Sequence, residues 1–241
     1  MRTIMNQEIL SKMTKAIKQF NLIEDGDTVA VGVSGGKDSL LLLSALAQFR
    51  RFGIVNFRLL AITVDFGRKD MDFSRVAELC NSLDVPYFQE DSNIYDVVFN
   101  IRKEKNPCSL CAKMRRGALC SAAIKHGANK IALGHHSDDL IETFMLSLLY
   151  EGRLSTFAPK SLMTRTNVTV IRPFVYVDEK EIIAESHDLP VVFNPCPANK
   201  HTKRQEVKNL IETLKQTNPI FKDNIFGALT NPNRNNLWQD D

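Results

Sequence analysis

Long apolar runs, the pattern of a signal peptide and a strong charge of either sign are not seen in this sequence of 241 residues. The stretch Leu40–Leu46 is interrupted by Ser44 and stops before Gln48, whereas a membrane-spanning helix needs about 18 apolar residues. The N-terminal letters MRTIMNQEILSKMTK do not follow the charged-then-apolar layout of a signal peptide. These absences favour a cytoplasmic protein without a membrane partner, and a net charge of +3 is too small to identify a nucleic-acid binder by itself.

Disulfide pairing is also not expected. The chain has five cysteines, an odd number, and a reducing compartment argues against a disulfide framework. The sequence shows no internal repeat and no low-complexity linker. With 44% hydrophobic residues, its length suits one α/β domain with a small appendage.

Strand and helix patterns alternate through most of the chain. Apolar segments predict strands at Thr28–Val33, Arg58–Val64, Val85–Gln89, Lys130–Leu133 and Val168–Ile171. Helical spacing predicts helices at Asn6–Phe20, Ser39–Phe52, Asp70–Leu83, Pro107–His126, Asp138–Tyr150, Asp178–His187 and Thr202–Lys215. Apolar strands separated by helices indicate a parallel sheet covered on both faces. We expect an N-terminal helical extension over 1–27, a core domain over 28–200, and a C-terminal helix and tail over 201–241.

The most informative segment joins the first strand to the next helix through the turn Ser34–Ser39, which reads SGGKDS. Glycine lets the backbone bend where a side chain would clash, so that consecutive N–H groups can face one anion. The start of the helix adds the positive end of its dipole, and Lys37 adds a full charge. The turn is not a Walker A loop, because Val31 and Asp38 stand where that motif needs Gly and Ser or Thr. It therefore predicts a phosphate-binding site of another kind.

This turn resembles the PP-loop of the ATP pyrophosphatase superfamily, whose signature is S-G-G-x-D-S. The matching positions are Ser34, Gly35, Gly36, Asp38 and Ser39. Members of the superfamily bind ATP, adenylate a substrate oxygen and release pyrophosphate. The resemblance implies an adenine-nucleotide alpha-hydrolase-like, Rossmann-like α/β fold, with a parallel sheet flanked by helices and short helical extensions at both ends. It also implies that hydroxyl and amide groups bind pyrophosphate and that Asp38 holds Mg²⁺.

Two further strand ends complete the expected nucleotide site. Val64 and Asp65 close the second strand, where we expect backbone groups to face adenine. A later strand runs into the letters GHHSDD, which resemble the G-H-x-x-D-D segment of superfamily members that act on tRNA. The residues assigned to the site from this segment are Gly134 for close approach of a phosphate, His135, and Asp138 or Asp139 for Mg²⁺. The alternative is ordinary helix capping by Ser137 and Asp138, and one of the two histidines is expected only to pack or to act as a spacer.

Three cysteines form the second informative group. Cys108 and Cys111 follow a proline at a helix start, and their i, i+3 spacing puts both thiols on one face. Cys196 lies between two prolines in the stiff turn Asn194–Pro197. From spacing alone, the C-x-x-C fits a redox pair, half of a zinc site or part of an iron–sulfur site, and the lack of a second pair weakens structural zinc. The remaining cysteines lie in apolar helical patterns and are expected in the core: Cys80 and Cys120.

Several motifs together resemble the tRNA 2-thiocytidine synthetase family. They are the PP-loop, C-x-x-C followed by Arg-Arg-Gly, G-H-H-x-D-D, I-R-P and N-P-C-P, and they extend over about Gly26–Pro197. That family thiolates a cytidine of the tRNA anticodon loop with ATP, Mg²⁺ and a [4Fe–4S] cluster held by three cysteines. The resemblance implies that Cys108, Cys111 and Cys196 hold the cluster. It also implies that ATP adenylates the base at C2–O, that a sulfur nucleophile held on the cluster attacks C2, and that AMP departs.

The expected partners are tRNA and a sulfur donor, either a cysteine desulfurase or free sulfide, and a homodimer is left open. Reaching an anticodon-loop base requires it to be splayed from its stack. The candidate contacts to RNA phosphates are Arg115, Arg116, Lys200, Lys203 and Arg204. For each of these groups the alternative is a solvated helix face.

Four other functions compete with this interpretation. A tRNA 2-thiouridine synthetase shares the core and the cluster, but carries additional C-x-x-C pairs that are absent here. A lysidine synthetase explains the ATP site and gives the cysteines no task. Thiolation without a cluster would use Cys111 as persulfide carrier and Cys196 as resolving thiol. A nucleotide-binding module without chemistry would explain the loop alone.

Overall fold

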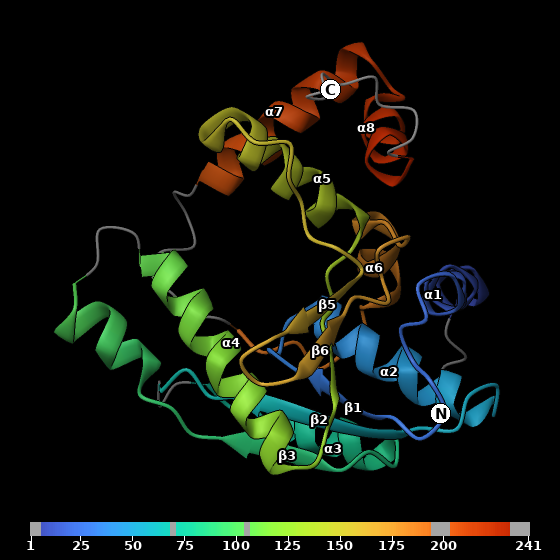
Figure 1. The fold of residues 1–241 in the computed structure, drawn as a ribbon, viewed down its shortest axis with the longest axis vertical. Coiled ribbons are helices and arrows are strands. Elements are labelled where there is room, and N and C mark those ends of the chain that lie inside the picture. Colours follow the sequence, from blue (N-terminus) through green and yellow to red (C-terminus); the bar gives the residue numbers. More distant parts are fainter. Residues whose placement is uncertain (1–5, 68–70, 104–106, 194–202, 232–241) are drawn as a thin grey trace. The chain divides into compact units, whose positions relative to one another are not determined.

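The computed structural model describes residues 6–67, 71–103, 107–193 and 203–231. The chain divides into two compact units (Figure 1). The first unit comprises Met1–His136 and Ala158–Ala198, and the second comprises Ser137–Phe157 and Asn199–Asp241. Within the described ranges, none of the helices has the length and apolar content that crossing a membrane requires.

The first unit contains a six-stranded sheet with the strand order β3-β2-β1-β4-β6-β5 (Figure 1). The strands are β1 (Thr28–Gly32), β2 (Arg58–Val64), β3 (Tyr87–Glu90), β4 (Lys130–Ala132), β5 (Lys160–Met163) and β6 (Val168–Ile171). All neighbours pair in parallel except β5, which runs antiparallel to β6 at the sheet edge. The predicted parallel α/β sheet is therefore confirmed, with one antiparallel edge strand added. The sequence analysis missed β5, whose residues alternate between exposed and half-buried and carry a weak apolar signal.

Helices cover both faces of this sheet because the strand order changes direction after β3. The helices of the first unit are α1 (Gln7–Gln19), α2 (Lys37–Arg51), α3 (Ser74–Ser82), α4 (Pro107–Lys125) and α6 (Glu179–Glu185), with a π-helical segment η1 (Asp96–Ile101). The order β1-β2-β3 advances toward one edge, whereas β4 returns to the other side of β1. Since parallel crossovers are right-handed, α2 and α3 lie on one face and α4 lies on the other.

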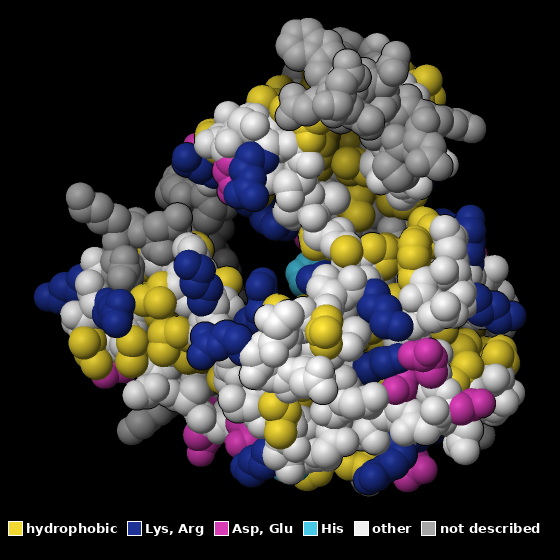
Figure 2. Space-filling model, viewed as in Figure 1, with side chains coloured by type: hydrophobic (Ala, Val, Ile, Leu, Met, Phe, Trp, Pro, Cys, Tyr) yellow, Lys and Arg dark blue, Asp and Glu magenta, His cyan; other side chains and the backbone are white. Residues whose placement is uncertain are grey.

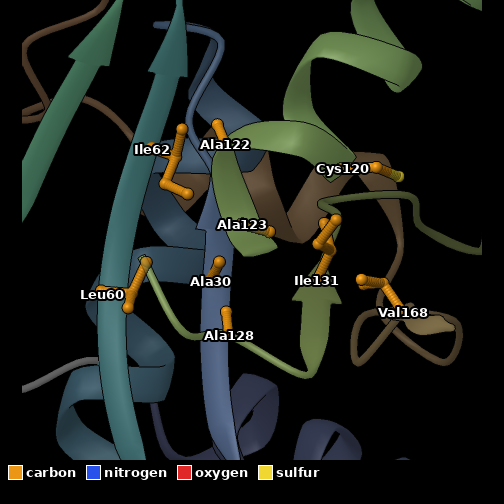
Figure 3. Packing of buried hydrophobic residues seen from close by; sticks show 9 residues of the cluster. All are labelled: Ala30, Leu60, Ile62, Cys120, Ala122, Ala123, Ala128, Ile131 and Val168. Atoms are coloured by element: carbon orange, nitrogen blue, oxygen red, sulfur yellow. The ribbon is translucent and has the colours of Figure 1, made fainter. Parts of the chain in front are cut away.

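The face under α4 shows how the apolar residues alternate along the strands (Figure 3). Ala30 on β1 and Leu60 and Ile62 on β2 point toward Ala122 and Ala123 of α4. Small alanines let the helix approach the sheet closely, and the larger strand side chains fill the space between them. Cys120 is also buried in this cluster, as predicted, and its pKa is raised by burial. Cys80 is buried on α3, and burial raises its pKa to about 11, so both thiols are core residues.

The change of direction between β1 and β4 fixes where a ligand can bind. In open α/β sheets, ligands bind beyond the carboxyl ends of the strands, at the point where the chain order reverses. Here that point lies between the turn after β1 and the residues after β4. These are Ser34–Gly36 and Leu133–His136, two of the segments that the sequence assigned to the nucleotide.

The opposite, amino ends of β1 and β4 hold a buried polar cluster. The Lys130 ammonium, almost completely buried, lies 2.6 Å from Asp27 and 2.8 Å from Glu24. Asn129 donates to Asp27 at 2.7 Å. Burial alone would raise the pKa of the Asp27 carboxyl, but its hydrogen bonds with Lys130 and Asn129 outweigh that effect and lower the pKa. This cluster is structural, because it lies at the strand ends remote from the reversal point.

The second unit is helical. It contains α5 (Ser137–Leu146), a π-helical segment η2 (Ser147–Glu151), α7 (Lys203–Thr217) and α8 (Phe221–Thr230). Ile141 and Met145 of α5 pack with Val207 and Ile211 of α7, and aromatic side chains of α8 extend this core. The sequence analysis expected a C-terminal helix followed by a tail, so α8 was missed.

Candidate functional site

The turn after β1 is held in shape by its own hydroxyl groups. The Ser34 N–H donates to Ser39 Oγ at 3.2 Å, and Ser39 Oγ donates to the Gly36 carbonyl at 2.9 Å. Gly35 has φ +81°, a left-handed conformation that side chains disfavour. The S-G-G-x-D-S spacing therefore encodes a closed loop in which each serine hydroxyl has a local partner.

Helix α2 begins at this loop with free anion-binding capacity. Its N-cap is Gly36, which supplies no side-chain hydrogen bond to the first turn. The first N–H groups of a helix lack intrahelical partners, and the helix dipole makes this end positive. Phosphate groups are the ligands that such an end binds best. The position and direction of α2 thus agree with the prediction from the sequence.

Two glycines are required by what lies against the loop. A Cβ on Gly134 would lie 2.8 Å from the Asp38 carbonyl carbon and oxygen, so the exit of β4 lies directly against the first turn of α2. A Cβ on Gly35 would lie 2.8 Å from Val192 Cβ, and the Val192 N–H donates to the Gly35 carbonyl at 2.9 Å. Gly134 therefore admits the backbone of Asp38 closely, and its contact with a phosphate stays a prediction.

Charged groups converge on the first turn of α2. The Lys37 ammonium lies 2.9 Å from Asp38 Oδ1 and 3.1 Å from Glu179 Oε1. Burial alone would lower the pKa of Lys37, but its hydrogen bonds and charge interactions with both carboxylates outweigh this and raise it. His136, almost completely buried, places Nε2 4.0 Å from Asp38 Oδ1. An ammonium, two carboxylates and an imidazole therefore lie together at the first turn of α2, where phosphate and Mg²⁺ are predicted to bind.

The turn after β2 is held by hydrogen bonds to Asp65. The Asp65 carboxylate accepts from the Gly67 N–H at 2.8 Å and from Gln89 Nε2 at 3.1 Å. Ser92 Oγ donates to the Asp65 carbonyl. Val64 packs against an apolar cluster that includes Phe66. Asp65 thus shapes the turn after β2, and the predicted contact of Val64 and Asp65 with adenine stays a prediction.

The two cysteines of the C-x-x-C lie on the first turn of α4. Cys108 is exposed, and Cys111 is half-buried against the apolar cluster of Phe66, Ile94 and Val98. Cys196, its turn Asn194–Pro197, and Lys200 lie outside the described residues. Among the described residues, no group of three or more His, Cys, Asp or Glu side chains could hold a metal ion. One exposed and one half-buried cysteine on the same helical turn fit two ligand positions of a cluster.

In the second unit, the acidic residues of α5 face cations from the C-terminal helices. Asp139 lies 3.0 Å from Arg204 of α7, and Glu142 lies 3.1 Å from the same guanidinium and 3.3 Å from Lys208. Asp138 pairs with Lys222 of α8. The structure therefore brings together two residues that the sequence assigned to different ligands, Asp139 to Mg²⁺ and Arg204 to RNA. Both assignments stay predictions.

The other candidate RNA contacts differ in exposure. Arg116 on α4 is exposed and Arg115 is half-buried. On the face shown in Figure 2, Lys and Arg side chains are frequent over α4. In the second unit, Lys203 is exposed, and its ammonium lies 4.3 Å from the centre of the Tyr150 ring.

Three residues near the loop were missed by the sequence analysis. His136 lies beside Asp38, and adjacent histidines give no signal that separates them, so the contact of His135 with the nucleotide stays a prediction. Glu179 and Val192 reach the loop from 142 and 157 positions further along the chain, so no local pattern marks them.

Comparison with known proteins extends over most of the chain. Residues 5–214 match the PP-loop domain family. A tRNA-cytidine(32) 2-sulfurtransferase from Citrifermentans bemidjiense is 41% identical over 228 residues, covering 92% of this chain and 89% of that protein. The protein of the same name from Geobacter metallireducens is 39% identical over 230 residues, covering 93% and 90%.

A solved structure supports the fold. The U34-tRNA thiolase NcsA from Methanococcus maripaludis, determined with its [4Fe–4S] cluster, has a TM-score of 0.74. It shares 24% identity with this chain and matches 92% of it and 76% of NcsA. At this identity the likeness concerns the fold, whereas the matches above concern the family. The chain belongs to the PP-loop family and, within it, to the family of the tRNA-cytidine(32) 2-sulfurtransferases.

Proposed function

We propose that this protein is an ATP-dependent tRNA sulfurtransferase that forms 2-thiocytidine in the anticodon loop. The observation that carries the proposal is a preformed PP-loop, with Lys37 and Asp38 at its helix start, in a chain 41% identical to a tRNA-cytidine(32) 2-sulfurtransferase. The loop supplies what the first chemical step needs, because that step develops charge on a departing pyrophosphate.

The loop residues act mainly in adenylation. The cytidine C2 oxygen attacks the α-phosphorus of ATP, an O–P bond forms, and the bond to the β-phosphate oxygen breaks. The N–H groups at the start of α2 and the Lys37 ammonium bind the phosphates and stabilise the pyrophosphate that leaves. Asp38, 34% exposed at its side chain, is the carboxylate that would hold Mg²⁺ against those phosphates.

Sulfur transfer is assigned to the cysteines. Cys108, Cys111 and Cys196 would hold a [4Fe–4S] cluster, which when bound offers an iron without a protein ligand for a sulfide. Attack of sulfur on C2 breaks the C2–O bond, and AMP leaves with that oxygen. The sulfide would come from a cysteine desulfurase or from free sulfide.

The chain connects the third cysteine with the PP-loop. Val192 is hydrogen-bonded to Gly35, and Phe193 follows it as an exposed residue. Cys196 follows Phe193 by three positions in the sequence, a reach of at most about 11 Å for an extended chain. This tether supports the assignment of Cys196 to the same reaction centre.

Contacts with tRNA are assigned to the cations that the sequence predicts for this role. They are Arg115 and Arg116 on α4, Lys203 and Arg204 on α7, and Lys200, which lies outside the described residues. Lysine and arginine neutralise phosphates and release counterions, so the affinity for tRNA should fall steeply with added salt. The target base has to leave its stack before C2 can react.

The decisive experiment measures the modified nucleoside and the iron together. Mass spectrometry of tRNA from a deletion strain should show loss of 2-thiocytidine, with recovery when the wild-type protein is supplied. Anaerobically purified protein should be brown and contain about four irons per chain. Cys196→Ala should lose the iron and the thiolation while it still binds ATP, because the phosphate loop is built separately.

The matched controls are the buried cysteines. Cys80→Ser and Cys120→Ser should keep both iron and activity, with a modest loss of stability. If the wild-type protein is colourless and still thiolates tRNA, the cluster is absent and a persulfide on Cys111 becomes the favoured sulfur carrier. Unchanged 2-thiocytidine in the deletion strain would refute the proposed substrate.

A further inference from the structure

The Lys37 ammonium is held by two carboxylates, one from the next residue in the chain and one from a distant part of the first unit. Asp38 is its neighbour in the chain, whereas Glu179 lies in the first turn of α6. An ammonium has three N–H donors in total. Two of them are therefore used by Asp38 and Glu179, and a third remains for a phosphate oxygen.

Glu179 reaches the loop from a well-anchored element. The Asp178 N–H donates to Glu181 Oε2 at 2.8 Å, which caps the start of α6. Lys12 of α1 donates to Glu181 Oε1 at 2.7 Å and ties the same turn to α1. Ile182 is completely buried next to them. The backbone that carries Glu179 is thus fixed without any contribution from the Glu179 side chain.

Within the function proposed above, the two carboxylates cannot play the same part. Asp38 is assigned to Mg²⁺, so it has to release Lys37 when the nucleotide and the metal bind. Glu179 is half-buried and bonded to Lys37 at 3.1 Å, and it can keep that contact while Asp38 turns away. We propose that Glu179 is a positioning residue that holds the Lys37 ammonium over the start of α2 for the phosphates of ATP.

The physical gain is pre-organisation. A lysine side chain loses considerable conformational entropy when it is ordered. With Glu179 present, that loss has already occurred before ATP arrives, so less of the binding energy is needed to order Lys37. The positioning role requires only a hydrogen-bond acceptor at that point, so an amide oxygen at the same place can replace the carboxylate oxygen.

The test is a double-mutant cycle on ATP binding. We would measure the affinity of a β,γ-imido analogue of ATP with Mg²⁺ by calorimetry, without tRNA. Glu179→Ala should weaken binding about fivefold, because Lys37 is then ordered only on binding. Glu179→Gln should stay within about twofold of the wild type, since its amide oxygen still accepts from Lys37. In a Lys37→Ala background, Glu179→Ala should have no further effect.

A control on the same helix and two contrary outcomes complete the test. Glu185→Ala removes a carboxylate that accepts from the Asn6 N–H and should leave the affinity unchanged. If Glu179→Ala lowers the affinity equally in the wild-type and Lys37→Ala backgrounds, Glu179 acts through the structure of α6 and not through Lys37. That result would refute the positioning role. Unchanged or tighter binding by Glu179→Ala would refute it as well. Because the measurement needs neither tRNA nor sulfur, failure of the thiolation assay would count against the proposed function alone.

Discussion

The PP-loop and helix α5 both present carboxylates to cations, but they obtain those cations in different ways. At the loop, Asp38 pairs with Lys37, the residue next to it, and the pair is partly exposed. On α5, the partners of Asp139 and Glu142 come from α7, which lies more than 60 positions further on. Glu142 is only 3% exposed. A local motif thus specifies the loop, whereas the α5 cluster exists only once the chain has folded.

This difference has consequences for energy as well as for prediction. A partly exposed ion pair contributes about 0–1 kcal/mol to stability, whereas breaking a buried pair costs about 3–5 kcal/mol. Residues of the loop can therefore change for chemistry with little effect on folding. Residues around Glu142 cannot change without affecting the helical unit.

Asp38→Ala should have the largest effect and should act on chemistry alone. Without its carboxylate, Mg²⁺ and the pyrophosphate are poorly held, and pyrophosphate release should fall about 100-fold or more. The thermal unfolding midpoint should change little, because the Lys37–Asp38 pair is partly exposed. Asp91→Ala, a change of an exposed aspartate outside the loop, is the control. Near-normal turnover by Asp38→Ala would show that the loop has another role.

Gly134→Ala tests whether the shape of the loop depends only on its own residues or also on the exit of β4. Its methyl group would lie 2.8 Å from the Asp38 backbone, which cannot move without shifting α2. We expect a destabilisation of about 2 kcal/mol together with weaker ATP binding. Gly117→Ala on α4, where a Cβ meets nothing within 4 Å, should be neutral or stabilising. Equal behaviour of the two variants would mean that the exit of β4 does not support the loop.

Much of the site can be predicted from the sequence because local residues specify it. The turn Ser34–Ser39, its strand and its helix are specified by neighbouring residues, so spacing alone predicts them. The parallel sheet follows from the alternation of apolar strands and helices, and the reversal at β1 and β4 then brings Gly134 to the loop. Each of these steps depends on short-range patterns and on general rules of topology.

The parts that the sequence analysis missed depend on weak or long-range signals. Strand β5 is a short edge strand with half-buried residues, and α8 follows Asn218-Pro219, which normally marks a turn. Glu179 is an ordinary surface glutamate until the fold brings α6 to the loop. The pairing of Asp139 with Arg204 likewise needs α7 to pack on α5, which no local pattern reveals.

Lys222→Ala should have a smaller effect, confined to the second unit. It removes the ion-pair partner of Asp138. Because the two side chains of this pair are each only about a fifth exposed, the loss should lower the free energy of unfolding by about 1 kcal/mol. Hydrogen exchange in α8 should become faster, while the sheet of the first unit stays unchanged. Lys215→Ala, which breaks only a pair within α7, should cost about 0.3 kcal/mol. Equal effects of both lysines would place Asp138 outside the cluster that stabilises this unit.

The smallest effect concerns pH, where the two units should respond with opposite sign. Burial raises the pKa of the Glu142 carboxyl above its ordinary value of 4.5, despite the nearby Lys208 and Arg204. The folded second unit therefore binds this proton more tightly than the unfolded chain does. The stabilisation is complete below the unfolded pKa and is lost as the pH rises through the folded one. Asp27, whose pKa is lowered, stabilises the first unit above its unfolded value of 3.8, and that contribution is lost as the pH falls.

Glu142→Gln separates these two responses, because it removes the titrating group and leaves the shape of the side chain nearly unchanged. Hydrogen exchange in mildly acidic and in neutral buffer, corrected for intrinsic rates, should show that α5 and α7 of the wild type lose protection as the pH rises. In Glu142→Gln that loss should disappear, while β1 and β4 should lose protection through Asp27 only when the pH is lowered below its unfolded pKa of 3.8. A variant whose α5 and α7 keep the wild-type pH response would mean that another group titrates there. In that case the ion pairs with Arg204 and Lys208 would affect the pKa of Glu142 more than its burial does.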